Sequence, residues 1–401
     1  FSNVPPLRFP EFSGEWEEHT LSEYLEFKNG LNPDAKRIGS GLPFISVMDI
    51  LSEGVINYDN IRGKVNATEK EIECFGVKDG DLLFQRSSET LEDVGRANVY
   101  MDNRTAIYGG FVIRGRKIGN YDPLFFKYLL ATPLARKRTC RMGAGAQHFN
   151  IGQEGLSKIS LYFPSIEEQR KIAGFLSLID ERIATQNKII EKLQSLIKGL
   201  NDNIHKGIKG ETVCFSDLGE AYSGLSGKGG DDFGYGEPFI TYMNVHQNTY
   251  ISEKDYELVQ IVPNEKQNSV QYSDALFTLS SETPEEVGIG AVYLGNTQKL
   301  YLNSFCFGIH FYDERVLPQY LAHFISSSSF RKAIYPLAQG STRFNLQKKD
   351  FMKMKFLLPS LEKQGRIANT LDALHCRLAN EKSLMEQYIL LKKYLLSQMF
   401  I

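Results

Sequence analysis

The chain has 401 residues, of which 42% are hydrophobic and 12% aromatic, and its formal net charge is -2. This composition excludes an intrinsically disordered chain, and the length predicts two or three domains. The charge excludes a global positive field, so a nucleic-acid-binding function would have to rest on local basic patches.

In chain order, the first predicted domain covers residues 1–164 and mixes short strands with short helices. Runs of β-branched and aromatic residues bounded by Gly, Asp or Asn predict strands at residues 43–47, 81–84 and 108–113. Residues 121–132 are expected to form a short helix. Positive charge then accumulates, because nine Lys or Arg and only one acid lie between Arg104 and Arg141.

A long helix is predicted within residues 165–211, with Ser165 as a candidate N-cap. Its apolar positions follow in steps of four and three residues, which is the 3.5-residue period of a coiled-coil seam. The seam consists of Ile172, Leu176, Ile179, Ile183, Gln186, Ile190 and Leu193. Such a helix would run for roughly 35–40 residues, or about 55 Å at ~1.5 Å per residue.

A second mixed domain is predicted for residues 212–358, with a strand at 300–311 and a short helix at 318–327. Seven basic residues and one acid lie between Arg331 and Lys355. The domain organisation therefore resembles that of the first half of the chain, including a basic stretch near its end.

A last helix is predicted for residues 359–401. Its seam consists of Ile367, Leu371, Leu374, Leu378 and Glu381. Because a single seam needs a partner, the two long helices are expected to pack against each other. Gln186 and Glu381 hold equivalent positions on the two seams. They either fix the register of the packing or face solvent at a loose end.

The two halves of the chain repeat each other. Residues 81–100 align without gaps to residues 274–293, and twelve of the twenty positions are identical, including a Ser-Ser-Glu-Thr run. Other blocks recur in the same order at an offset of 195 residues. The chain is therefore a tandem duplication of one unit, a globular part followed by a helix. The fold class is α+β, with two pseudo-symmetric mixed domains.

No motif for catalysis is found. Residues 224–229 superficially resemble a phosphate-binding loop, but Tyr222 replaces its first Gly and Gly229 replaces the Ser or Thr after Lys228. The seven histidines are scattered, so no metal cluster is expected. The five cysteines are widely spaced, which fits the reducing cytoplasm, and neither a signal peptide nor a membrane span of ~18 apolar residues is expected.

Basic and polar side chains in both halves are candidates for DNA contact. Each basic stretch leads into a Gly-containing polar loop, where the backbone can approach phosphate and side chains can reach bases. The candidates are Arg136, Arg138, Arg141 and Gln147 in the first half and Gln339, Thr342, Arg343 and Lys348 in the second. The alternative for these loops is an ordinary solvated turn.

The repeated Ser-Ser-Glu-Thr run adds Ser87 and Ser88, together with Ser280 and Ser281. Its identity in both halves indicates a common task, which is either turn geometry or contact with something that both halves meet, such as the DNA backbone. Arg86 precedes the first copy and has no basic counterpart in the second. It is therefore a candidate guanine reader.

The openings of the two helices carry a family resemblance. Residues 164–173 (PSIEEQRKIA) and 359–368 (PSLEKQGRIA) resemble the pattern that begins each spacer helix in the specificity subunits of type I restriction–modification enzymes. The resemblance covers the whole chain, as domain, helix, domain and helix.

This resemblance implies two target-recognition domains, each binding half of a split double-stranded DNA target, around an antiparallel pair of helices. The helices would set the gap and dock two methyltransferase subunits, which carry S-adenosylmethionine and methylate an adenine flipped out of the duplex. Two restriction subunits, where present, would cut unmodified DNA with ATP and Mg. The chain itself would be non-catalytic and bind no cofactor.

Two alternatives belong to other classes. One is a self-sufficient DNA methyltransferase or nuclease, which the missing motifs disfavour. The other is a structural coiled-coil adaptor whose two domains bind proteins, which the position of the basic loops disfavours.

Overall fold

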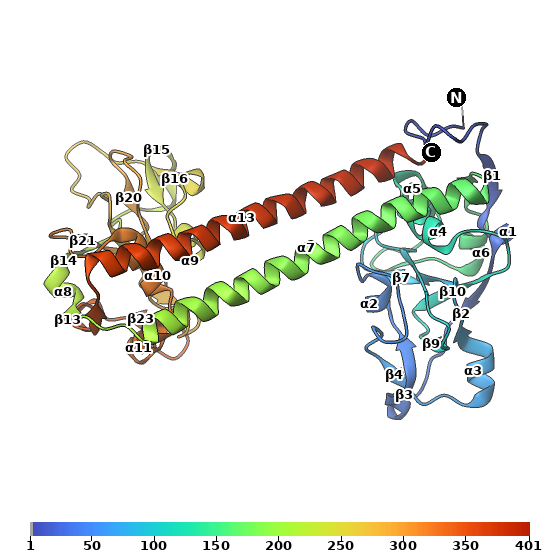
Figure 1. The fold of residues 1–401 in the computed structure, drawn as a ribbon, viewed down its shortest axis with the longest axis horizontal. Helices are drawn as coiled ribbons and strands as arrows, with labels where there is room; N and C mark the ends of the chain where they lie inside the picture. Colours follow the sequence, from blue (N-terminus) through green and yellow to red (C-terminus); the bar gives the residue numbers. More distant parts are fainter. Residues whose placement is uncertain (1–2) are drawn as a thin grey trace. The chain divides into compact units, whose positions relative to one another are not determined.

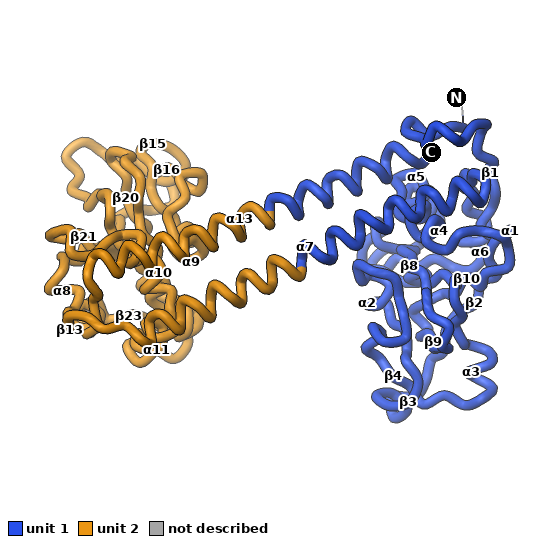
Figure 2. The backbone as a smooth tube through the Cα atoms, viewed as in Figure 1, with its two compact units in different colours: residues 1–187, 383–401 blue, residues 188–382 orange. Residues whose placement is uncertain are grey.

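The structure is a computed structural model that describes residues 3–401. It divides into two compact units, drawn in different colours in Figure 2. Unit 1 comprises Phe1–Asn187 and Ser383–Ile401, and unit 2 comprises Lys188–Lys382. Each unit therefore contains one globular part and a portion of both long helices.

The two long helices are continuous (Figure 1). Helix α7 spans Ile166–Lys206 with 41 residues, and α13 spans Leu361–Gln398 with 38 residues. The predicted N-cap is confirmed for α7, because the Ser165 Oγ accepts a hydrogen bond from the Glu168 backbone N–H at 3.3 Å. The Glu168 side chain does not complete a capping box. Its carboxylate instead accepts two hydrogen bonds from Arg8, each of 2.7 Å.

The glutamine in each helix opening makes equivalent hydrogen bonds in the two units. Gln169 is buried, accepts from the Asp122 backbone N–H at 3.1 Å and donates to the Pro164 carbonyl at 3.0 Å. Gln364 accepts from the Leu317 backbone N–H at 2.7 Å and donates to the Pro359 carbonyl at 2.9 Å. In both units this side chain fastens the start of a long helix to the start of a short one.

Unit 1 is built from short elements. Its strands are β1 (Glu17–Thr20), β2 (Leu25–Asn29), β3 (Ile38–Ile45), β4 (Lys64–Val65), β5 (Gly76–Val77), β6 (Leu82–Gln85), β7 (Ser87–Ser88), β8 (Ala97–Val99), β9 (Ala106–Tyr108), β10 (Val112–Lys117), β11 (Phe149–Asn150) and β12 (Ser160–Phe163). Its short helices are α1 (Leu21–Tyr24), η1 (Ala35–Arg37), α2 (Val47–Ile50), α3 (Glu69–Phe75), α4 (Pro123–Leu130), α5 (Pro133–Arg141) and α6 (Gln153–Ser157). The central sheet is antiparallel in the order β2-β10-β6-β8, and a second sheet has the order β4-β3-β9-β5 with β3 and β9 parallel.

Unit 2 repeats this plan. Its strands are β13 (Glu211–Cys214), β14 (Gly219–Ser223), β15 (Phe233–Ile240), β16 (Tyr256–Val259), β17 (Ala275–Thr278), β18 (Ser280–Ser281), β19 (Gly290–Val292), β20 (Tyr301–Leu302), β21 (Cys306–Phe311), β22 (Ala338–Gln339), β23 (Phe344–Leu346) and β24 (Lys355–Leu358). Its short helices are α8 (Phe215–Leu218), η2 (Gly230–Asp232), α9 (Tyr242–Gln247), η3 (Glu253–Asp255), α10 (Pro318–Ile325), α11 (Ser328–Ile334), η4 (Tyr335–Leu337) and α12 (Lys348–Met352). The central sheet β14-β21-β17-β19 matches β2-β10-β6-β8, and β16-β15-β20 matches β4-β3-β9. The mixed, duplicated fold is confirmed.

Two of the predicted strands are wrong as single elements. Residues 108–113 contain the end of β9 and the start of β10, and residues 300–311 contain all of β20 and β21. In each case the chain turns between two sheets, at Gly109–Phe111 in unit 1 and at Asn303–Phe305 in unit 2. The turn-forming pairs Gly109-Gly110 and Asn303-Ser304 mark these breaks within otherwise apolar runs.

The helix seams pack into the cores of the units. In unit 1 the start of α7 (Ile172, Leu176) shares a core with the end of α13 (Leu395). In unit 2 the start of α13 (Ile367, Ala368, Leu371) shares a core with Leu200 and Ile204 near the end of α7. Each unit therefore pairs the beginning of one helix with the end of the other, which is the expected antiparallel arrangement.

The other seam residues are also covered. Ile179 is buried, and Ile183, Ile190, Leu193, Leu374 and Leu378 are half-buried. Gln186 and Glu381 are only 5% and 6% exposed, so the alternative that they face solvent is wrong. Their role in fixing the register stays a prediction.

Candidate nucleic-acid interface

Strand pairing joins two segments that the sequence presented separately. In unit 1, β7 (Ser87–Ser88) pairs antiparallel with β11 (Phe149–Asn150). In unit 2, β18 (Ser280–Ser281) pairs with β23, so that Ser280 lies opposite Asn345 and Ser281 opposite Phe344. The repeated serine run therefore lies directly against the Gly-containing loop. We call the segments 144–150 and 339–345 the glycine hairpins of units 1 and 2.

The two glycine hairpins have the same backbone conformation. Gly145 has φ +146° and Gly340 has φ +144°, in the region that favours glycine. A Cβ atom at Gly145 would lie 2.0 Å from the His148 carbonyl oxygen, and one at Gly340 would lie 2.0 Å from the Arg343 carbonyl oxygen. Each hairpin therefore requires glycine at this position, and each closes on the residue three positions later.

The tips of the glycine hairpins differ in their side chains. Unit 1 presents Ala146, Gln147 and His148, and unit 2 presents Ser341, Thr342 and Arg343, all of them exposed. One backbone frame thus carries two sets of exposed side chains, most of which can form hydrogen bonds with base edges. His148 was not singled out from the sequence, although the 195-residue offset makes it the counterpart of Arg343 in unit 1.

Arg343 is held by its surroundings. Its Nε donates a hydrogen bond to the Ser280 Oγ at 2.9 Å, and its guanidinium carbon lies 5.1 Å from the centre of the Phe305 ring. These groups border a hollow of about 300 Å³ that Tyr242 and Glu286 also line. Within residues 3–401, neither terminal nitrogen of Arg343 has a hydrogen-bond acceptor, so both remain available to a ligand. Phe305 carried no signal in the sequence.

The serines beneath the hairpins have structural partners. The Ser87 Oγ donates to the Asn150 Oδ1 at 2.5 Å, and the Ser88 Oγ accepts from the Thr90 backbone N–H at 3.3 Å. The Ser281 Oγ donates to the Glu286 carboxylate at 3.0 Å. Turn geometry therefore accounts for part of their repetition, and their contact with DNA stays a prediction.

Several arginines of the first basic stretch turn inward. Arg136 donates to the backbone carbonyls of Glu92 at 2.9 Å and Val94 at 2.6 Å. Arg138 donates to Glu18 at 2.7 Å and to the Ser160 carbonyl at 2.5 Å. Burial lowers the pKa of Arg136, since charge is costly away from water. DNA contact by Arg136 or Arg138 stays a prediction, and this geometry does not support it.

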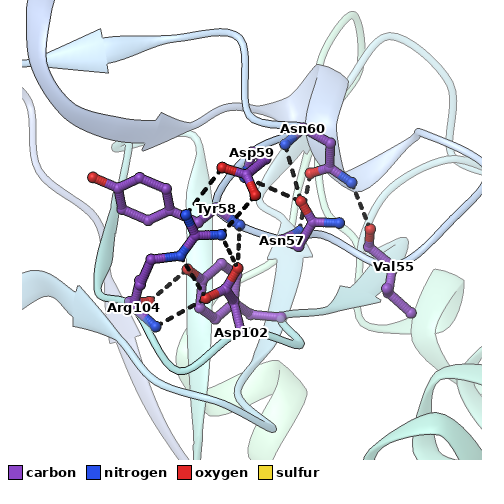
Figure 3. A network of polar contacts seen from close by, with 8 residues as sticks. Val55, Asn57, Tyr58, Asp59, Asn60, Asp102 and Arg104 are labelled. Atoms are coloured by element: carbon purple, nitrogen blue, oxygen red, sulfur yellow. Dashed lines mark hydrogen bonds and ion pairs between the residues drawn. The ribbon is translucent and has the colours of Figure 1, made fainter.

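Arg104, at the start of the same stretch, is neutralised by two carboxylates (Figure 3). It donates to Asp59 at 2.7 Å and to Asp102 at 2.8 Å, and it lies 4.3 Å above the ring of Tyr58. Its guanidinium holds the pKa of both carboxyl groups below the usual range. Arg104 therefore adds no unpaired positive charge to the basic stretch that ends at Arg141.

The remaining candidates for DNA contact differ in how exposed they are and in whether the protein already occupies their polar groups. Arg141 is exposed at the end of α5 and has no hydrogen bond or ion pair to the part of the chain that the structure describes. Gln147, Gln339 and Thr342 are exposed. Lys348 donates to the Ser223 Oγ at 2.6 Å, and half-buried Arg86 lies 3.4 Å from the Gly110 carbonyl. Among the candidate cations, Arg141 and Arg343 are thus the most accessible to a DNA ligand.

Among residues 3–401, no three His, Cys, Asp or Glu side chains are arranged to hold a metal ion. None of the helices in that range is long and apolar enough to cross a membrane.

Comparisons with known proteins agree with this architecture. A family model described as "Type I restriction modification DNA specificity domain" matches residues 13–195 and again residues 210–387. The putative type I restriction enzyme MjaX specificity subunit of Methanocaldococcus jannaschii is 24% identical, over 98% of this chain and 95% of that protein. The EcoKI specificity subunit of Escherichia coli is 24% identical over 47% of this chain and 41% of that protein.

Solved structures show the same fold. The S subunit of a type I restriction–modification system from M. genitalium has a TM-score of 0.57 at 13% identity and covers 99% of both chains. A chain from a study of complex assembly in the type I system has a TM-score of 0.61 at 14% identity, covering 98% of this chain and 99% of that one.

Proposed function

This chain belongs to the type I restriction–modification DNA specificity family, and we propose that each of its units reads one part of a split DNA target through its glycine hairpin. As a specificity subunit it recognises DNA and is non-catalytic. The observation that carries the proposal is the pair of hairpins with one backbone conformation and different tips. A common frame suits two sites that meet the same kind of duplex, and different tips suit two different half-sites.

Arg343 supplies the clearest reading chemistry. An arginine that offers both terminal nitrogens can bind the O6 and N7 atoms of guanine in the major groove. The contacts with Ser280 and Phe305 restrict its side chain before DNA arrives, which lowers the entropy lost on binding. Arg141 is better suited to phosphate, because it is exposed and has no partner within the described residues.

The chain acts, in this proposal, with two methyltransferase subunits that carry S-adenosylmethionine and methylate adenine. Exposed apolar side chains on the helices of unit 1 support docking of a protein there. Leu178 on α7 is 59% exposed, and Leu390 and Tyr394 on α13 are 65% and 58% exposed. Large apolar side chains in water commonly mark a protein interface. Restriction subunits with ATP and Mg would join the same complex. Helices α7 and α13 would set the gap between the two half-sites. The free cysteines fit a cytoplasmic location.

The test is a domain exchange. The chain is co-expressed with its methyltransferase subunit, and methylated adenines are mapped by long-read sequencing. Replacing residues 212–358 by the equivalent region of a relative is expected to change one half of the target and leave the other half unchanged. A change in both halves, or in neither, would contradict the modular reading.

A further inference from the structure

Two exposed phenylalanines hold equivalent places in the two units. Phe111 is 68% exposed and Phe305 is 49% exposed. Each lies at the end of the turn between two sheets, directly before β10 in unit 1 and directly before β21 in unit 2. Within residues 3–401, neither ring belongs to a hydrophobic core. Core packing therefore does not explain why both turns carry phenylalanine.

The backbone ties each phenylalanine to the glycine hairpin of its unit. The phenylalanine carbonyl accepts a hydrogen bond from the backbone N–H of the residue before the serine run. The carbonyl of that residue accepts one from the residue that follows the hairpin. The three residues are Phe111, Arg86 and Ile151 in unit 1 and Phe305, Leu279 and Leu346 in unit 2, with N–O distances of 2.7 to 2.9 Å. Both rings are therefore carried by a backbone that is bonded to the hairpin in the same way.

A methionine accompanies the phenylalanine in both units. Met243, the second residue of α9, lines the hollow of about 300 Å³ together with Phe305 and Arg343. Met48 is the second residue of the corresponding helix α2 in unit 1. Both methionines are exposed. The same pair of large apolar side chains is thus present in both units, although the hairpin tips differ.

Identical and variable side chains suit different tasks at a split DNA target. Half-sites of different sequence require different readers, as the hairpin tips provide. A side chain that is the same in both units suits an event that is common to both half-sites. In the proposed function this event is the flipping of one adenine per half-site, since the adenine N6 is inaccessible inside the duplex. Apolar side chains such as Phe and Met can enter a base step and unstack it.

We propose that Phe111 and Phe305 are wedges, each of which enters the base stack beside the flipped adenine of its half-site and stacks on the bases left behind. This rests on the proposed function, which supplies the DNA and the flipped adenine. Arg343 favours DNA as the ligand of this surface, because its guanidinium carbon lies 5.1 Å from the centre of the Phe305 ring. A base bound by Arg343 therefore comes close to the ring. An aromatic ring stacks on any base, so one wedge serves half-sites of any sequence.

The test uses the chain assembled with its methyltransferase subunit, on duplexes that carry the mapped target. 2-Aminopurine replaces the target adenine in one half-site at a time, and its fluorescence rises when it leaves the stack. Phe111→Ala is expected to reduce this rise and to slow single-turnover methylation about tenfold in one half-site, and Phe305→Ala in the other. Tenfold corresponds to ~1.4 kcal/mol of lost stacking. The recognised sequence is expected to stay the same.

A mismatched duplex distinguishes a wedge from a structural role. A target adenine placed opposite a wrong base leaves the stack at lower cost. Both variants are therefore expected to methylate this duplex nearly as fast as the wild type does.

Matched controls lie at the other end of the same strands. Ile118 directly follows β10 and Tyr312 directly follows β21, and both are exposed. Ile118→Ala and Tyr312→Ala are expected to change neither fluorescence nor methylation. Circular dichroism checks that every variant is folded.

The outcomes separate the two proposals. Phenylalanine variants with the fluorescence and methylation rate of the wild type overturn this inference and leave the proposed function intact. Slow methylation that the mismatch does not restore, or loss of methyltransferase subunits in native mass spectrometry, would assign the rings to protein packing and also overturn it. A changed target sequence would make the rings base readers and not wedges. An unsubstituted complex that binds no DNA would refute the proposed function itself.

Discussion

Arg343 and Ser280 are joined by a hydrogen bond of 2.9 Å from the arginine Nε to the serine Oγ. The two residues lie 63 positions apart, and strand pairing between β18 and β23 brings them together. The bond uses the inner edge of the guanidinium group and leaves its terminal nitrogens for a ligand. A residue from the repeated run thus orients a residue from the variable tip.

The first prediction concerns this pair. Arg343→Ala is expected to relax one base position of the second half-site and to cost about 1–3 kcal/mol in discrimination. Ser280→Ala is expected to weaken binding less, because it removes the orientation and not the contact. Fluorescence anisotropy with target and single-mismatch duplexes measures both in the assembled complex. Equal affinities for all duplexes in wild type and variants would remove Arg343 from base recognition.

Exchanging the tip side chains between the hairpins is expected to transfer their base preference. The triple variant Ala146→Ser, Gln147→Thr and His148→Arg gives the first hairpin the tip side chains of the second, on the frame set by Gly145. We expect only the first half-site to change, because the second hairpin is untouched. Sequencing of methylated adenines reports both half-sites at once. The conservative variant Gln147→Asn serves as a control for disturbance of the loop, and an unchanged first half-site would show that the tip does not read bases.

Neighbouring arginines on α5 should behave differently. Arg141→Ala is expected to lower the dependence of log affinity on log salt by about one unit, because it removes one phosphate contact. Arg136→Ala is expected to lower the free energy of unfolding by about 1–3 kcal/mol, because the carbonyls of Glu92 and Val94 lose their donor. Salt titrations and denaturant unfolding distinguish the two effects. A reversed pattern would mean that Arg136, and not Arg141, faces DNA.

The end of α7 should make stability depend on pH. The pKa of His205 is lowered, mainly because the side chain is buried. The hydrogen bond with the Asn201 carbonyl acts in the opposite direction, and positive charge on His323 lowers the pKa further. Below pH ~6.5 the unfolded chain therefore binds a proton that the folded chain does not. The resulting stability is present above that pH and is lost as the pH falls toward the folded pKa.

The variant His205→Phe tests this dependence. It retains a ring beside Tyr320 and Phe324 but cannot be protonated. Urea unfolding at pH 7.5 and 5.5 is expected to show a smaller loss of stability in the variant than in the wild type. The variant Lys254→Gln, altered at an exposed site, serves as the control and is expected to lose as much stability as the wild type. Identical losses in wild type and His205→Phe would show that His205 does not titrate in this range.

The sequence alone determined the duplication, the two long helices and their openings. These features are encoded locally: apolar side chains at steps of four and three residues define one face of a helix, and similar blocks such as residues 81–100 and 274–293 can be aligned without knowledge of the structure. The burial of Gln186 and Glu381 could not be derived in this way, because solvent exposure depends on what packs against the seam.

Only the tertiary structure decided which charged side chains face outward. Arg136 and Arg141 lie five residues apart in one basic stretch, yet Arg136 is occupied by carbonyls more than forty positions earlier in the chain. The pairing of Ser87 and Ser88 with residues 149–150 likewise spans about sixty positions. A side chain's direction is set by the donors and acceptors that the folded backbone brings near it. Unpaired polar groups are costly to bury, so these long-range bonds, and not the local charge, determine which arginines remain free.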